Sequence, residues 1–203
     1  MKAFSIVESL QFGWHTMRAH SALVFQVVLT LLALEVARAI VQKVLAGTAL
    51  GLLASLVLFA ATAVLGIGAT RIALRLAQGH SAHYADIVPP MRLLWPYIAA
   101  SLLAGLAVIG GLILLILPGV FVAVRLSMVR FEVIDGAGIR ESLNKSWALT
   151  EGHFWRLFLF MLALIVLNVL GALAFMVGLL VSIPVTMLAY AHVYQKLKAA
   201  QHS

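Results

Sequence analysis

Long apolar runs constrain this fold more than any other feature of the sequence. Six of them stand at about 21–44, 48–70, 95–116, 118–134, 154–177 and 181–197. A helix needs roughly 20 apolar residues to cross the hydrocarbon of a bilayer, and backbone groups facing lipid must be paired within the segment. Hydrophobic residues make up 64% of the chain and charged residues only 10%, which argues against a soluble domain. The sequence therefore predicts an all-α membrane protein, a single polytopic domain over 1–203 with six transmembrane helices.

The runs 118–134 and 181–197 are short for a full crossing. At 1.5 Å per residue, each reaches only about 25 Å. Pro118 and Pro184 lie near their starts, and proline suits the first turn of a helix because its missing N–H has no partner there. We expect both prolines at helix starts after tight turns. The alternative is a kink within a helix, in which case the fourth helix begins near Gly110 and Gly111.

Basic residues concentrate at alternate connections between the runs. They precede the first run, lie between the second and third and around the fourth and fifth, and follow the sixth: Lys2, Arg18, Arg71, Arg75, Arg92, Arg130, Arg140, Lys145, Arg156, Lys196 and Lys198. Of the basic residues, only Arg38 and Lys43 lie near another connection. Positive charge marks the cytoplasmic side of a membrane protein. The pattern predicts three hairpins with both termini in the cytoplasm.

A polar segment that contains tryptophan occurs twice, each time before an apolar run. IVESLQFGWHTMRAH at 6–20 shares Ile, Glu, Ser, Leu, Trp and His with IRESLNKSWALTEGH at 139–153. A weaker third copy places Ile87, Met91 and Trp95 at the same spacing, which puts three apolar groups on one helical face. Tryptophan on such a face suits headgroup depth. We expect an internal repeat with cytoplasmic interfacial amphipathic helices at about 4–18, 87–95 and 138–151; solvated loop helices are the alternative.

Polar residues inside the apolar runs are candidates for an intramembrane site. Glu35 and Arg38 lie three residues apart, and Asn168 takes the place of Glu35 in the repeat. Polar groups at membrane depth are commonly functional, so these three residues are predicted to form a shared polar set inside the bundle. The alternative is a self-neutralising Glu35–Arg38 pair, with Asn168 in an interhelical hydrogen bond.

Basic residues near the predicted cytoplasmic side are candidates for lipid headgroup contact. They are Arg125, Arg130, Arg140, Lys145 and Arg156. A basic residue near an anionic surface contributes about 1 kcal/mol. Arg125 has no acidic neighbour within its run, so we expect it to pair with Glu35 or to snorkel to an interface. The alternative for the basic residues as a group is that they only set topology.

The sequence contains no convincing catalytic or metal-binding pattern. Cysteine is absent, and no serine stands in a nucleophile elbow. His80, His83 and Asp86 have a ligand-like spacing, but Gly79 and Pro89 place them in a loop. We therefore expect no enzymatic activity, no cofactor, no metal and no nucleic-acid partner. Small residues at Gly47-x-x-x-Gly51 and Ala174-x-x-x-Gly178 favour close helix packing, either internal or between copies of the chain.

LPGVFVAVRLSMVRFEVID at 117–135 and GIRESLNKSWALTEGHFWRLFLFML at 138–162 together resemble a broad group of bacterial six-span membrane proteins. The matching residues are Pro118, Gly119, Arg125, Glu141, Ser142, Leu143, Ser146, Trp147, Gly152, Phe154, Trp155 and Arg156. The group includes the membrane domain attached to some glycerophosphoryl diester phosphodiesterases, and related inner-membrane families of uncharacterised function. The resemblance implies six helices in a bacterial inner membrane and no catalytic residues, because the catalytic part of those enzymes is a separate soluble domain.

These observations favour an integral inner-membrane protein that acts as a lipid-contacting scaffold or accessory protein in envelope maintenance. Its expected partners are anionic phospholipids, with a second membrane protein or a second copy of the chain also possible. The alternative is a small transporter or channel with a polar site inside the helix bundle.

Overall fold

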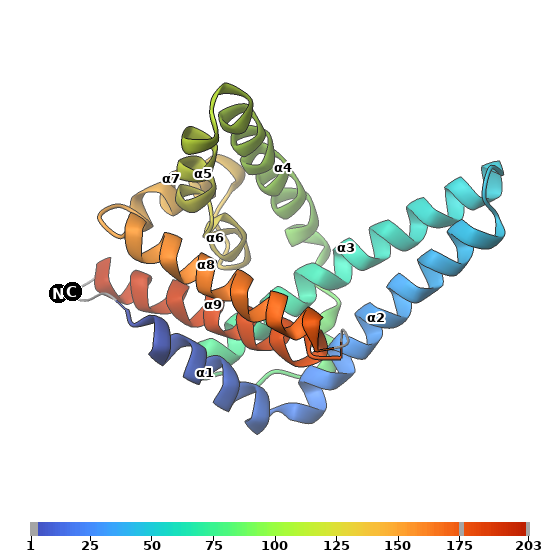
Figure 1. The fold of residues 1–203 in the computed structure, drawn as a ribbon, viewed down its shortest axis with the longest axis horizontal. Coiled ribbons are helices and arrows are strands. Elements are labelled where there is room, and N and C mark those ends of the chain that lie inside the picture. The colour runs from blue at the N-terminus through green and yellow to red at the C-terminus, as the bar shows by residue number, and fades with distance from the viewer. Residues whose placement is uncertain (1–3, 175–176, 202–203) are drawn as a thin grey trace.

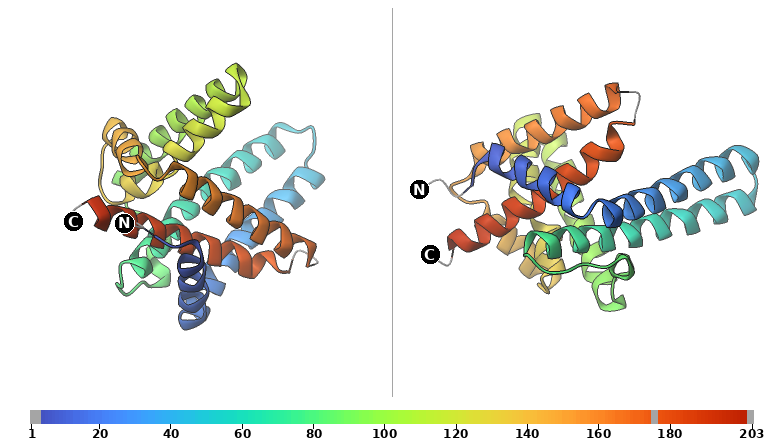
Figure 2. Two further views of the ribbon diagram at one scale, coloured as in Figure 1. Left: turned by 60° about the vertical axis from the view of Figure 1, so that its left-hand side comes forward. Right: turned by 90° about the horizontal axis from the view of Figure 1, so that it is seen from below.

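The computed structural model describes residues 4–174 and 177–201, and over these residues the regular structure is helical throughout. The helices are α1 (Ile6–Ala19), α2 (Ser21–Val44), α3 (Ala49–Ala77), the 3-10 helix η1 (Tyr84–Ile87), α4 (Met91–Leu114), α5 (Ile116–Arg125), α6 (Val129–Ile134), α7 (Ile139–Leu149), α8 (Phe154–Leu173) and α9 (Leu179–Gln201). The predicted all-α class is confirmed. The pairs α2–α3, α4–α5 and α8–α9 form hairpins that project in different directions (Figures 1 and 2).

In the part of the chain that the structure describes, four helices are long and apolar enough to cross a membrane. These are α2, α3, α4 and α8, which correspond to the predicted runs 21–44, 48–70, 95–116 and 154–177. The chain is therefore a multi-pass membrane protein with four candidate spans. Few residues in the most apolar part of these helices are fully buried within the chain. Many of their large apolar side chains, such as those of Leu53, Ile113 and Leu173, are exposed instead.

Helix α9 lies at the centre of the packed region, and α1 lies along it (Figure 1). Val185, Ala189 and other α9 side chains are buried in the main core. At Gly13 of α1, an added Cβ would lie 2.4 Å from the carbonyl oxygen of Val185, so glycine is what permits this close approach. Lys196 of α9 reaches back to Glu8, with Nζ 3.1 Å from Oε1. The N-terminal helix is thus docked onto the protein.

Helices α1 and α7 occupy the ranges predicted for the first and third interfacial helices, but their contact faces differ from the expected ones. The buried residues are Ser9, Gly13 and Met17 in α1, and Ser142, Ser146 and Leu149 in α7. Trp14 and Trp147 are 39% and 40% exposed. Mostly small side chains face the protein, because they allow the helices to approach closely, and the tryptophans lie at the edge of the contact.

The segment 87–95 does not form a separate interfacial helix. Ile87 ends η1, and after two prolines α4 begins at Met91 and continues through Trp95 to Leu114. Pro89 and Pro90 account for the difference, since proline disfavours helical backbone in the residue before it. Trp95 is therefore in the first turns of a candidate span.

The predicted fourth span, 118–134, is broken into α5 and α6. Pro118 lies in the first turn of α5, as expected, but the helix ends at Arg125 and the next begins at Val129. Ser146 of α7 fills the break: its Oγ donates to the Arg125 carbonyl oxygen at 2.8 Å and accepts from the Met128 N–H at 3.2 Å. A broken helix leaves backbone groups without partners. Here one hydroxyl is the partner of both a carbonyl oxygen and an N–H group.

The sixth run also differs from the prediction. Helix α9 begins at Leu179, so Pro184 lies inside the helix and not at its start. Neither α9 nor α5–α6 is among the four candidate spans. Gly178 packs directly against Gly171 of α8, where an added Cβ would lie 2.5 Å from the Gly171 carbonyl oxygen. This part of the small-residue stripe therefore serves packing within the chain.

We predict that Ser146→Ala destabilises the protein by about 1–3 kcal/mol, because it leaves the buried Met128 N–H without its partner. The measurement is the free energy of unfolding of the purified protein in detergent. Ser142→Ala is the matched control: it is equally buried on α7, but its hydroxyl bonds only to Ile139 of its own helix. Equal effects of the two substitutions would contradict the role given to Ser146.

Candidate functional site

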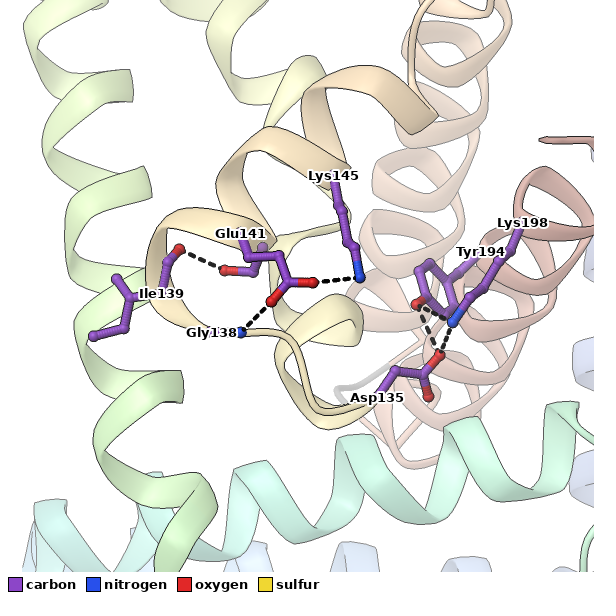
Figure 3. A network of polar contacts seen from close by, with 8 residues as sticks. Asp135, Gly138, Ile139, Glu141, Lys145, Tyr194 and Lys198 are labelled. Atoms are coloured by element: carbon purple, nitrogen blue, oxygen red, sulfur yellow. Dashed lines mark hydrogen bonds and ion pairs between the residues drawn. The ribbon is translucent and has the colours of Figure 1, made fainter. Parts of the chain in front are cut away.

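The α6–α7 turn is the centre of a polar network, which Figure 3 shows from close by. Asp135 begins this turn. The Tyr194 hydroxyl donates to its Oδ2 at 2.9 Å, and Lys198 Nζ lies 2.6 Å from the same oxygen. Gln78, directly after α3, donates to Oδ1 at 3.3 Å. One carboxylate therefore joins the ends of α3, α6 and α9, and the contacts found for it are with these structural partners.

The first turn of α7 lies beside this network (Figure 3). Glu141 accepts the Gly138 N–H at 3.1 Å and lies 2.7 Å from Lys145 Nζ. The hydrogen bond from Lys145 holds the pKa of Glu141 below its usual value. Both side chains are about half exposed, so the pair is a weak surface contact. Lys145 therefore already has a carboxylate partner within its own helix.

The end of α3 and the segment after it form a second charged cluster. Asp86 lies 3.8 Å from Arg71 and 3.3 Å from Arg75, and its Oδ2 accepts the His83 N–H. Among the described residues, no group of three or more His, Cys, Asp or Glu side chains is placed to hold a metal ion. Asp86, the last residue of the His-x-x-His-x-x-Asp pattern, instead pairs with Arg71 and Arg75. Next to this cluster, Arg71 and Arg92 line a groove of about 400 Å³ that reaches the α6–α7 turn.

Arg125 is held by α7 and not by Glu35. Its Nη1 donates to the Trp147 carbonyl oxygen at 3.3 Å, and its guanidinium lies 5.2 Å from the ring centres of Phe121 and Trp147. Cation–π contacts of this kind stabilise a guanidinium close to apolar surroundings. Arg125 therefore has a positioning role beside the α5–α6 break.

The predicted intramembrane polar set falls into two separate contacts. Arg38 Nε donates to Glu35 at 3.0 Å, which is the self-neutralising pair. On the α8–α9 hairpin, Asn168 accepts from Ser182 at 2.9 Å and lies 3.4 Å from the Thr186 hydroxyl. No hydrogen bond or ion pair found among the described residues links Asn168 to Glu35 or Arg38. Each group is satisfied locally, so the structure does not assemble them into one site.

The remaining predicted basic residues lie in different surroundings. Arg140 is exposed on α7, and Arg156 is half-buried in the first turn of α8, 6.0 Å from the ring centre of Phe4. Arg130 is exposed at the start of α6, beside a crevice between the hairpins. Only Arg130 among the five predicted residues lines this crevice.

The crevice encloses about 680 Å³ between α3, α4, α5–α6, α8 and α9. Its polar lining is Thr70, Ser101, Ser127, Arg130, Asn168, Thr186 and Tyr190. Its apolar lining includes Val108, Ile109, Leu126, Met161, Leu164 and Ile183. Sequence reasoning considered serines only as nucleophiles, so it missed the shared location of Ser101 and Ser127. No local signal could have found it, since five separate segments build the crevice.

Comparison with known proteins places this chain in a family without assigning an activity. Residues 97–201 match the family described as "Protein of unknown function (DUF975)". The match runs from the first turns of α4 to the end of α9 and so covers the crevice apart from its α3 wall. No curated protein and no solved structure matches.

We predict that Asp135→Asn lowers the free energy of unfolding by about 1–3 kcal/mol, because a charged hydrogen-bonded group is removed from three partners. Hydrogen exchange should show the loss at the C-terminal end of α9, where Tyr194 and Lys198 lie. Glu141→Gln is the control, since it keeps an acceptor for Gly138 and removes only an exposed pair; no measurable change is expected. Unaltered exchange of α9 in Asp135→Asn would show that this network does not hold the helix end.

Proposed function

This chain belongs to the DUF975 family of membrane proteins of unknown function, and we propose that it is a non-enzymatic, lipid-contacting scaffold or accessory protein of the bacterial inner membrane. The observation that carries the proposal is the exposure of the candidate spans. Large apolar side chains along these helices, such as Leu53, Ile113 and Leu173, are more than 60% exposed, so lipid or another membrane protein must cover them. The proposed role in envelope maintenance rests on the basic residues of the interfacial helices and on the lack of a catalytic pattern, and the resemblance of residues 118–156 to bacterial inner-membrane proteins supports the location.

The contacts of α7 support six crossings in three hairpins. Ile139 and Leu143 of α7 pack against a cluster formed by Ala100, the tenth residue of α4, and two valines of α6. If α4 crosses the bilayer, the chain must return before α7, and only α5 and α6 lie between them. Because of the break at 126–128, the returning segment is not one continuous apolar helix. Ser146 keeps the backbone at the break hydrogen-bonded.

The same argument applies to α9. Helix α8 leaves the region of α7, and α9 brings the chain back, because Lys198 binds Asp135 and Lys196 binds Glu8. Both termini then lie on one side of the membrane. The basic residues gathered at the connections on that side support a cytoplasmic location.

The internal repeat gains support from burial at equivalent positions. Ser9 and Ser142 are both fully buried, and Trp14 and Trp147 are exposed to nearly the same extent. Each helix directly precedes a candidate span, α2 after α1 and α8 after α7. This agrees with a repeated module made of a docked helix and a hairpin.

The absence of enzymatic activity is part of the proposal. Charged groups around the α6–α7 turn pair with one another, as Asp135 does with Lys198. The buried hydroxyls of Ser146 and Thr150 lie within hydrogen-bond distance of backbone carbonyl oxygens. These contacts give each group a structural role. The exposed Arg140 and half-buried Arg156 are available to anionic headgroups, and the projecting α2–α3 hairpin offers apolar surface to a second copy or another membrane protein.

A small transporter or channel is the second candidate. The crevice between the hairpins favours it, because a polar, partly open space among candidate spans is what a substrate site needs. Asn168 and Thr186 would face the substrate partway along this path.

The test is the lipid composition of nanodiscs that carry the native protein directly from its membrane. We expect anionic phospholipid to be enriched over the bulk membrane, and we expect the enrichment to fall severalfold when Arg140, Lys145 and Arg156 are all changed to Gln, since basic residues near the surface attract anionic lipid. Arg38→Gln is the control, because Arg38 pairs with Glu35 away from these residues.

Two results would contradict the proposal. Protein-dependent solute flux through vesicles of the purified chain would favour the transporter. Turnover of a lipid substrate by the purified chain would replace the scaffold with an enzyme.

A further inference from the structure

We propose that the crevice between the hairpins binds one anionic phospholipid, with its phosphate at Arg130 and its acyl chains along the apolar walls. This inference rests on the lipid-contacting function proposed above and names a single site for it. The site differs from the surface residues Arg140, Lys145 and Arg156, none of which lines the crevice.

The polar end of the crevice fits a phosphate group. Arg130 is exposed there. Within residues 4–174 and 177–201, no ion pair of Arg130 is found. Ser127 and Tyr190 line the same space. A guanidinium binds phosphate through two parallel hydrogen bonds, and hydroxyl groups beside it can donate to the remaining oxygens.

Ser101 adds an independent indication of an occupant. Its Oγ is buried and has no hydrogen-bond partner among the described residues. Buried polar groups in proteins nearly always have a partner. Ser101 lies on the α4 wall of the crevice, where a polar headgroup would supply one.

The rest of the crevice fits acyl chains. On α4, Val108 and Ile109 lie about 10 to 12 Å beyond Ser101 at 1.5 Å per residue, and Ile183 of α9 lies on the same lining. Ile109 and Ile183 are 55% and 50% exposed. Asn168, the polar group on the α8 wall, is already bonded to Ser182. A cation at one end and apolar walls at the other are complementary to an amphiphile and not to a fully soluble anion.

The volume and the surroundings of the crevice also suit a lipid. At about 680 Å³, the crevice lies within the usual range of small-molecule sites, about 300–1,000 Å³, so it can hold a headgroup and part of the chains. The walls are candidate spans or their return helices, so a lipid can enter sideways from the bilayer.

Two variants test the two ends of the site. Arg130→Gln removes the charge. Gly105→Leu adds a bulky side chain to the crevice, because Gly105 lines it and an added Cβ there has no atom within 4 Å. Gly110→Leu is the matched control: Gly110 is also in α4 with open space around an added Cβ, but it does not line the crevice.

The experiment is native mass spectrometry of the full chain after reconstitution in phosphatidylcholine nanodiscs with phosphatidylglycerol as the anionic lipid. We expect one phosphatidylglycerol to remain on the wild type and on Gly110→Leu. Arg130→Gln and Gly105→Leu should each bind it about tenfold more weakly, because a charge-assisted contact or the space for the chains is lost. Circular dichroism shows that the variants keep their helices.

The outcomes separate this site from the general function. If Arg130→Gln and Gly105→Leu retain the lipid and the triple variant of Arg140, Lys145 and Arg156 loses it, the crevice site is wrong and the lipid-contacting function stands. If the wild type retains no phosphatidylglycerol and shows no enrichment, both are wrong. Loss in Arg130→Gln with full retention in Gly105→Leu would overturn the acyl-chain part, leaving a headgroup anion alone.

Discussion

The structure depends on the rule that backbone polar groups cannot be left unpaired inside apolar surroundings. The break between α5 and α6 violates this rule unless another group intervenes, and Ser146 supplies both partners from a neighbouring helix. This contact fixes α7 against α5 and α6, and so fixes the turn that begins at Asp135. Asp135 in turn holds α9 through Tyr194 and Lys198. The hydrogen bonds of Ser146 at the helix break therefore help to position α7, the α6–α7 turn and the end of α9 relative to one another.

The length and apolar character of a sequence run were sufficient to predict a helix where that helix makes few specific contacts. The apolar runs predicted α2, α3, α4 and α8 well, because a long apolar helix forms in lipid whatever it packs against. They failed at 118–134, where the run stays apolar across the break. The signal for the break is Ser146, 21 positions after Arg125, and only the folded chain brings the two together. Pro184 was misplaced for a related reason: a proline can lie inside a helix when neighbouring segments compensate.

The chemistry of the candidate residues was predictable, but their partners were not. The sequence indicated that Arg125 needs a partner for its charge. In the structure, its partners are two aromatic rings and a carbonyl oxygen, not Glu35. Glu35 already has Arg38 three residues away, and a neighbour on the same face of the helix is close by before any tertiary contact forms. Arg130 is the opposite case. Its surroundings come from helices distant in sequence, so composition could indicate a lipid contact without locating it.

The crevice links the two functional candidates, because a space between diverging hairpins must be filled. Around α9, side chains such as Tyr194 and Leu197 fill the space and the core is closed. Towards the ends of the hairpins, residues such as Ile109 and Ile183 remain half exposed, and the hairpins separate (Figure 1). A transported solute would leave these apolar walls uncovered between cycles. The phospholipid proposed here would cover them continuously and would give Arg130 a counter-charge, so it would satisfy both the apolar and the electrostatic demand of one surface. The exposed apolar walls are therefore an argument for the proposed resident lipid over a transported solute.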